Sequence, residues 1–160
     1  MIHRDRRSAT WKTVPGELAV SEARSFAGDD VVLAVGLFRA SDVGLFGRVS
    51  CLGTSGIEFD GLAGFGGPPA GPSPTDPCLW VEVGGEIILS EIQGGSTSLD
   101  ESGVSAWDFE VWFPFDVTSM RDDVAMHVAW RRISAEPAVF TLSRDLIRGA
   151  ASRSLTIDLA

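Results

Sequence analysis

The sequence predicts an all-β domain: an antiparallel β-sandwich, or a flattened barrel, of about eight or nine strands with one short C-terminal helix. Three observations support this prediction. Short apolar segments recur along the chain with glycine, proline or aspartate between them. Within most of these segments apolar and polar residues alternate, which is the period of a strand with one buried face. Only one segment, near the C-terminus, has the spacing of an amphipathic helix.

The domain is expected to begin after a flexible tail. Residues 1–15 are polar and basic, so residues 16–160 form the expected single domain. A chain of this length can bury a substantial core without disulfides or metals. Apolar residues from Leu18 to Phe26 alternate loosely and predict the first strand of the domain.

A hairpin is expected next. The segment Val31–Ala40 is apolar on both faces, which predicts a central strand. Turn residues follow at Asp42-Val43-Gly44, and Leu45–Leu52 alternates as a returning strand.

The segment 61–77 holds five glycines and five prolines. Such a composition cannot continue a strand and predicts a long irregular surface loop. A short strand at Ile57–Phe59 is expected to lead into it. The loop offers a place for function without indicating which function.

A second hairpin is expected after this loop. Leu79–Val83 alternates, Gly84-Gly85 supplies a turn, and Glu86–Ile92 returns. Residues 94–103 are rich in glycine and serine and predict a polar loop.

A third hairpin is expected from Trp107–Phe113 and Val124–Trp130, which both alternate and are joined by residues 115–123. Trp107 and Trp130 fall on the apolar phase of their strands and are expected in the core.

The C-terminal region predicts a strand, a helix and a closing strand. The strands are Val139–Leu142 and Leu155–Leu159, and Ser143 is a suitable N-cap for the helix between them. The helix carries one apolar stripe, made of Leu146, Ile147, Ala150 and Ala151.

Charge and hydropathy limit the partners. A net charge of −9 and a pI near 4.6 argue against nucleic acid, because phosphate binding needs a basic surface. Acidity suits a basic protein partner, or simply keeps the domain soluble. No apolar run approaches the roughly 18 residues that a membrane helix needs. The N-terminus also lacks the apolar centre of a secretory signal, so we expect a cytoplasmic protein with no membrane partner.

Metal and cofactor sites are not expected. In a reducing cytoplasm Cys51 and Cys78 are expected as two buried thiols, whereas in a secreted protein they would pair. Together with His3 and His127 they lack the spacing of a structural zinc site. The glycines at the start of the long loop lack the lysine and helix of a phosphate-binding loop, so no cofactor is predicted.

One constellation could support catalysis. If the third hairpin forms, Asp108 and Glu110 come near His127 on its polar face. A carboxylate beside a histidine is a general acid–base arrangement. Cross-strand charge pairing on a wet sheet face explains the same residues equally well.

Aspartates in turns could bind calcium. The candidate pairs are Asp29 with Asp30 and Asp122 with Asp123, and Asp42 or Asp116 would join them if the loops converge. Aspartate is also common in turns because its side chain bonds the local backbone.

Trp80 and Trp112 fall on the opposite phase from their apolar neighbours. Exposed, they would stack on sugars or anchor a protein partner. Alternatively, the long loop or the helix covers them.

Two stretches resemble a loosely defined family of small uncharacterised β-rich proteins from high-GC bacteria. They are Val31–Leu52 and the segment from Trp107 through Trp130 to the helix. In that family a Trp-rich strand, a Pro-rich turn and a second Trp-bearing strand precede a short helix. This chain departs at the turn, where Pro114-Phe115-Asp116 and Arg121-Asp122-Asp123 replace most of the prolines. The resemblance implies a bacterial β-rich domain and carries over no functional residues.

The leading hypothesis is a non-enzymatic domain that acts by protein–protein interaction, with another protein or as a homodimer. Its basis is the acidic charge, the off-phase tryptophans, the long loop and the lack of a catalytic motif. The first alternative is a sandwich that binds a glycan or calcium. The second is a small hydrolase or isomerase that uses His127 with Asp108 or Glu110.

Overall fold

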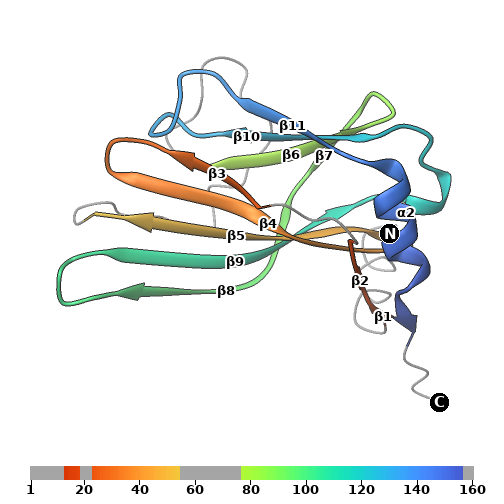
Figure 1. The fold of residues 1–160 in the computed structure, drawn as a ribbon, viewed down its shortest axis with the longest axis horizontal. Coiled ribbons are helices and arrows are strands. Elements are labelled where there is room, and N and C mark those ends of the chain that lie inside the picture. The colour runs from red at the N-terminus through yellow and green to blue at the C-terminus, as the bar shows by residue number, and fades with distance from the viewer. Residues whose placement is uncertain (1–12, 19–22, 55–76, 157–160) are drawn as a thin grey trace.

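The computed structural model describes residues 13–18, 23–54 and 77–156. In these ranges the chain forms two main antiparallel sheets that pack face to face, with a short helix at one end (Figure 1). This confirms the all-β sandwich, and the sheets do not close into a barrel. The expected strand Ile57–Phe59, and all but the last residue of the loop 61–77, lie outside the described residues.

The larger sheet has the strand order β2 (Gly16–Glu17), β4 (Val31–Ser41), β5 (Gly44–Gly53), β9 (Ser105–Pro114) and β8 (Glu91–Leu99), and β3 (Arg24–Ala27) also pairs with β4. The smaller sheet has the order β11 (Ala138–Leu142), β10 (Val124–Ala129), β6 (Cys78–Val83) and β7 (Glu86–Leu89). A separate pair joins β1 (Thr13–Val14) to β12 (Leu155–Thr156).

The main core lies between the two sheets and is built by the alternation seen in the sequence. Alternate side chains of the inner strands β4, β5, β9, β6 and β10 point inward and are buried, among them Leu33, Val49, Val81 and Met126. Trp107 and Trp130 are buried in this core, as expected. The predicted first hairpin is confirmed, because β4 and β5 pair along their length.

A β-bulge interrupts β4. Gly36 lies opposite Arg48, but Arg39 lies opposite Phe46, so Leu37 and Phe38 together face one residue of β5. An extra residue shifts the side-chain phase of the strand that follows. Phe38 therefore enters the core and is 1% exposed, whereas Leu37 points outward and is 65% exposed. The continuous apolar run of β4 gives no sign of this shift.

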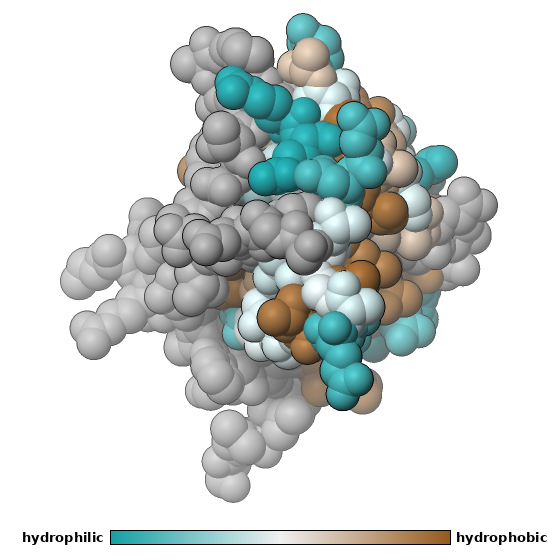
Figure 2. Space-filling model, turned by 90° about the vertical axis from the view of Figure 1, so that its left-hand side faces the viewer, coloured by the Kyte–Doolittle hydropathy of each residue, from teal (hydrophilic) through white to brown (hydrophobic). Residues whose placement is uncertain are grey.

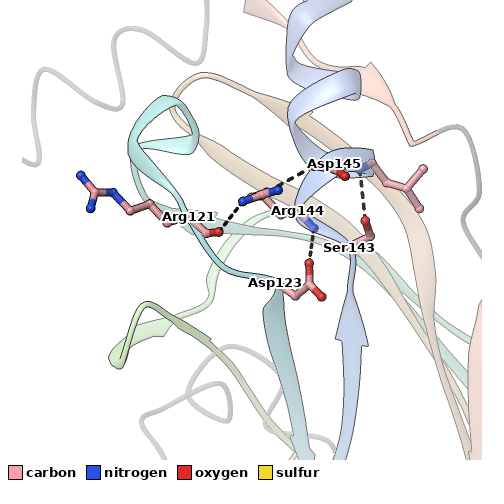
Figure 3. A network of polar contacts seen from close by, with 6 residues as sticks. Arg121, Asp123, Ser143, Arg144 and Asp145 are labelled. Atoms are coloured by element: carbon pink, nitrogen blue, oxygen red, sulfur yellow. Dashed lines mark hydrogen bonds and ion pairs between the residues drawn. The ribbon is translucent and has the colours of Figure 1, made fainter.

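The helix α2 (Arg144–Ser152) packs at one end of the sandwich and begins at the predicted cap. The Ser143 side chain accepts a hydrogen bond from the Leu146 amide, and Asp123 accepts one from the Arg144 amide at 2.8 Å (Figure 3). The Arg144 guanidinium donates to the carbonyl of Arg121 at 2.7 Å. The helix start is thus fixed to the segment before β10. The predicted apolar stripe is confirmed, because Ile147 and its neighbours in the next turn are buried.

The predicted third hairpin is wrong. β9 lies between β5 and β8 in the larger sheet, and β10 lies between β6 and β11 in the smaller one. Residues 115–123 cross from one sheet to the other and include a short 3-10 helix, η1 (Val117–Ser119). Both strands therefore have their backbone groups paired on both sides by other strands. Alternation along two strands does not reveal which sheet each one joins.

The predicted polar loop at 94–103 is wrong over residues 94–99, which are part of β8, whereas residues 100–103 form a turn. After the Gly84-Gly85 turn, where both residues have the expected positive φ, β7 ends at Leu89 and the chain crosses at Ser90 to the larger sheet. β8 then runs to Leu99, beside β9. Glycine and serine have low intrinsic strand preference, but the ladder with β9 and tertiary packing override it. A side chain at Gly95 would lie 2.2 Å from the Phe109 ring, so this position needs a glycine.

Two expectations near the N-terminus need smaller corrections. The strand expected from Leu18 to Phe26 is described only as β3, at Arg24–Ala27, while β2 lies before Leu18 on the same side of β4, and residues 19–22 lie outside the described residues. Residues 13–14 of the expected tail form β1, and residues 1–12 lie outside the described residues.

Candidate functional site

The outer face of the larger sheet carries two ion pairs between neighbouring strands. Arg48 on β5 contacts both carboxylate oxygens of Asp108 on β9, with Nε 2.7 Å from Oδ1. Arg39 on β4 lies 2.8 Å from Glu110 on β9. These four side chains share a face because the register sets Arg48 opposite Glu110 and places Asp108 two residues away. Asp108 and Glu110, the candidate acidic residues of the sequence analysis, are thus each paired with an arginine.

The ion pair of Arg48 and Asp108 keeps both groups charged. Its hydrogen bonds lower the pKa of the Asp108 carboxyl below its usual 3.8 and raise the pKa of Arg48. The Ser50 hydroxyl donates a further hydrogen bond to Asp108 at 3.1 Å. An ionised aspartate held by an arginine in this way is a positioned anion and lacks the free basicity of a general base.

Leu37 stands beside these ion pairs in an unusual backbone conformation. Among the described residues it is the one non-glycine with positive φ, at +50°. The left-handed region costs a non-glycine residue about 1–2 kcal/mol, and strained residues of this kind cluster at functional sites. Because most of the Leu37 side chain is exposed, its burial offsets little of this strain.

Two hollows adjoin on this face. One, of about 500 Å³, is lined by Leu37, Leu18 and Glu17 together with both arginines. The other, of about 380 Å³, lies over the glycines of β8 and is lined by Ser96 and Asp108. Arg48 and Glu110 line both, so the two hollows form one surface that runs from the bulge in β4 to the edge strand β8. We call this surface the Leu37 face.

The structure separates the residues of the catalytic hypothesis. His127 lies on the outer face of the smaller sheet, whereas Asp108 and Glu110 lie on the outer face of the larger one. The expected proximity is therefore wrong, because two packed sheets stand between these groups. His127 instead stacks on Trp80, with ring centroids 4.9 Å apart, and its Nε2 lies 3.5 Å from Glu82.

Trp80 and Trp112, the aromatic candidates, are both buried. Trp80 is 5% exposed and Trp112 is fully buried. Trp112 stacks on Phe46 on the outer face of the larger sheet, with centroids 6.1 Å apart. Its indole nitrogen has no hydrogen-bond partner in the part of the chain that the structure describes. Neither indole offers an open platform for a sugar or a partner side chain in this conformation.

The aspartate pairs do not converge. Asp30 forms an ion pair with Arg132 at 2.7 Å, beyond the C-terminal end of β10, whereas Asp123 precedes the N-terminal end of the same strand. The six residues of β10 place these sites about 20 Å apart. Asp116 caps η1, and the described residues contain no cluster of metal-ligand side chains.

Figure 2 faces the end of the molecule that carries the β3–β4 turn. In that view hydrophilic residues gather above and below a hydrophobic patch.

The two cysteines are buried, as expected for a reducing compartment, and both are free thiols. Burial raises the pKa of Cys51 to about 12 and that of Cys78 to about 11. They belong to different sheets, with Cys51 in the main core and Cys78 beside Trp80 and Ala129 on the other side of the smaller sheet.

Sequence analysis did not predict the two features that define the Leu37 face, which are the bulge in β4 and the strand β8. The signal available for β8 was weak: Thr97 and Leu99 alternate with serines. No helix of the described residues is long and apolar enough to cross a membrane. Comparison with protein-family models, curated proteins and solved structures gives no match.

Proposed function

We propose that this protein is a non-catalytic bacterial binding module that recognises another protein through the Leu37 face. The observation that carries the proposal is Leu37, a leucine that is 65% exposed and held at a φ of +50°. Glycine would satisfy this backbone conformation without strain. The leucine side chain adds little to the fold, and an exposed apolar residue bordered by polar side chains has the arrangement of a protein interface.

The surroundings of Leu37 support the proposal. Protein interfaces typically have an apolar centre and a polar rim in which arginine is common. Here Leu37 is flanked by Arg39 and Arg48, each already oriented by a carboxylate on β9. Oriented charges lose less conformational entropy when a partner binds than free side chains do.

The expected setting is the bacterial cytoplasm, which the two free, buried thiols support. The glycan and calcium alternative loses its platform and its ligand cluster in the described residues. The hydrolase alternative loses the expected contact of His127 with Asp108 or Glu110, which lie on the other sheet. Neither has an observation that favours it over protein binding.

The test is affinity capture from cells of the natural host with four baits, each quantified by mass spectrometry. The baits are the wild type, Leu37→Gly, Leu37→Ala and Leu155→Ala. Leu155 is a matched control because it is 67% exposed on β12. The proposal expects proteins that the wild type and the Leu155→Ala variant retain and that both Leu37 variants lose. Retention of the same proteins by all four baits, or capture of none, would overturn it.

A further inference from the structure

β8 is the open edge of the larger sheet (Figure 1). Within the described residues it pairs with β9 alone, and no other strand pairs with its second edge. Residues 93–99 are exposed, and the register shift between Ile92 and Gly94 affects only the beginning of the strand. The rest of β8 therefore presents a row of backbone donors and acceptors that another strand can pair with.

Proteins usually protect such edges, and β8 lacks most of these protections. Edge strands are commonly kept short or carry charges or proline. β3 and β7 have four residues each and β11 has five, whereas β8 has nine. From Ile92 to Leu99 it has no charged residue and no proline.

The edge is continuous with the Leu37 face. The hollow over Gly94 opens beside β8 and shares Arg48 and Glu110 with the hollow at Leu37. Three strand spacings, about 14 Å, separate β4 from β8. One partner segment added to β8 can therefore place alternate side chains over Gly94, while the rest of that partner reaches Leu37.

Charge indicates what kind of partner fits. Asp100 and Glu101 lie exposed in the turn directly after β8. The Ser102 hydroxyl and nearby amides bond the Asp100 carboxylate and lower its pKa, so it stays ionised. The carboxylates on β9 are neutralised by arginines, which leaves the end of β8 acidic and its middle uncharged.

A second copy of the chain fits less well. Each copy carries a net charge of −9, which opposes self-association. Antiparallel pairing of two β8 strands would also bring Glu91, at the start of one strand, towards the acidic turn at the end of the other.

We propose that β8 binds, by strand addition, an extended segment of a basic protein, with lysine or arginine beside Asp100 and Glu101. Backbone hydrogen bonds along Gly94–Leu99 supply the affinity, and the acidic turn and the hollow over Gly94 supply the selectivity. This proposal rests on the proposed function, because it names the form and charge of the partner at the same surface.

The experiment is selection of a random peptide library on the immobilised full-length protein. Selected peptides are then titrated against the wild type, Ser98→Lys and Ser25→Lys. Ser98 is exposed on β8, and a lysine there adds a charge that blocks edge pairing. Ser25 is the matched control, because it is exposed on the other edge strand β3. Unfolding curves for both variants verify that they fold.

The expected result is a set of peptides rich in β-branched and basic residues. Ser98→Lys is expected to weaken their binding about tenfold or more and Ser25→Lys to leave it unchanged. Added salt should weaken binding further. Failure to enrich any peptide, enrichment of acidic peptides, or equal binding to Ser98→Lys would overturn the proposal.

The two proposals fail separately. If Leu37→Gly abolishes capture of host proteins and Ser98→Lys does not, the Leu37 face is the binding surface and strand addition at β8 is wrong. If neither variant affects capture, both proposals are wrong.

Discussion

Arg48 on β5 and Asp108 on β9 form a two-point ion pair on the outer face of the larger sheet, with Arg48 Nε 2.7 Å from Asp108 Oδ1. The pair lies between the bulge at Leu37 and the edge strand β8 and lines the hollow beside β8. Because planar guanidinium and carboxylate groups match at two points, the contact fixes the direction of both side chains. It orders the polar part of the Leu37 face between Leu37 and β8.

The first prediction concerns Asp108→Asn and pH. The pKa of Asp108 is lowered in the folded protein, so its ionised form stabilises the fold above the usual pKa of 3.8. That contribution declines as the pH falls through 3.8 and is lost below the folded pKa. We expect the wild type to be modestly more stable than Asp108→Asn at neutral pH, with the difference closing in acid. Thermal unfolding of both proteins across this range measures it.

Asp29→Asn is the control for this series, because Asp29 is exposed in the turn between β3 and β4. A stability difference between the wild type and Asp108→Asn that stays constant from neutral pH into acid would contradict the assignment of Asp108 as a paired anion.

The second prediction concerns the strain at Leu37. Leu37→Gly removes the cost of a positive φ, whereas Leu37→Ala keeps it. Both variants remove a largely exposed side chain. We therefore expect Leu37→Gly to be more stable than Leu37→Ala by about 1 kcal/mol in urea unfolding. Equal stabilities, or a more stable alanine variant, would show that Leu37 is not strained.

The third prediction concerns the start of α2. Ser143→Ala removes the side-chain acceptor for the Leu146 amide and should lower the free energy of unfolding by about 1 kcal/mol. Ser143→Asp restores an acceptor and adds a negative charge at the helix N-terminus, so it should recover most of the loss. Urea unfolding of the three proteins checks this, and an unchanged midpoint for Ser143→Ala would count against the cap.

The fourth prediction concerns the thiols. Burial raises the pKa of both cysteines, to about 12 for Cys51 and about 11 for Cys78, so thiolate is scarce at mildly alkaline pH. We expect a chromophoric disulfide reagent to react slowly with the native protein and rapidly after guanidinium is added. Rapid reaction of either thiol in the native protein would mean that its site opens without global unfolding.

Much of the fold could be predicted because it depends on local pattern. The alternation of apolar and polar residues in Leu45–Leu52 and Trp107–Phe113 indicates which side chains face the core. Gly84-Gly85 indicates a turn, and Ser143 indicates the start of the helix. The partner of each strand could not be predicted in this way. After residues 115–123 the next strand could lie beside β9 or in the other sheet, and both arrangements bury the same apolar face of that strand.

The candidate site was harder to predict for two reasons. The bulge in β4 lies inside a continuous apolar run, where a change of phase leaves no trace in the sequence. β8 contains Gly94, Gly95 and two serines, and its strand conformation comes from pairing with β9 and from the Phe109 ring over Gly95. The sequence pattern places Asp108 and Glu110 on one polar face of their strand. It does not identify their arginine partners, because these lie on β4 and β5, and the positions of those strands relative to β9 are seen only in the structure.

The most direct measurement is amide hydrogen exchange on the protein alone and in complex with a captured host protein. The account predicts slower exchange on binding in the segments that cover residues 36–39 and 93–99, and no change in the segment that covers β11. Protection confined to β10 and β11 of the smaller sheet, with the bulge and β8 unchanged, would contradict the claim that the Leu37 face binds the partner.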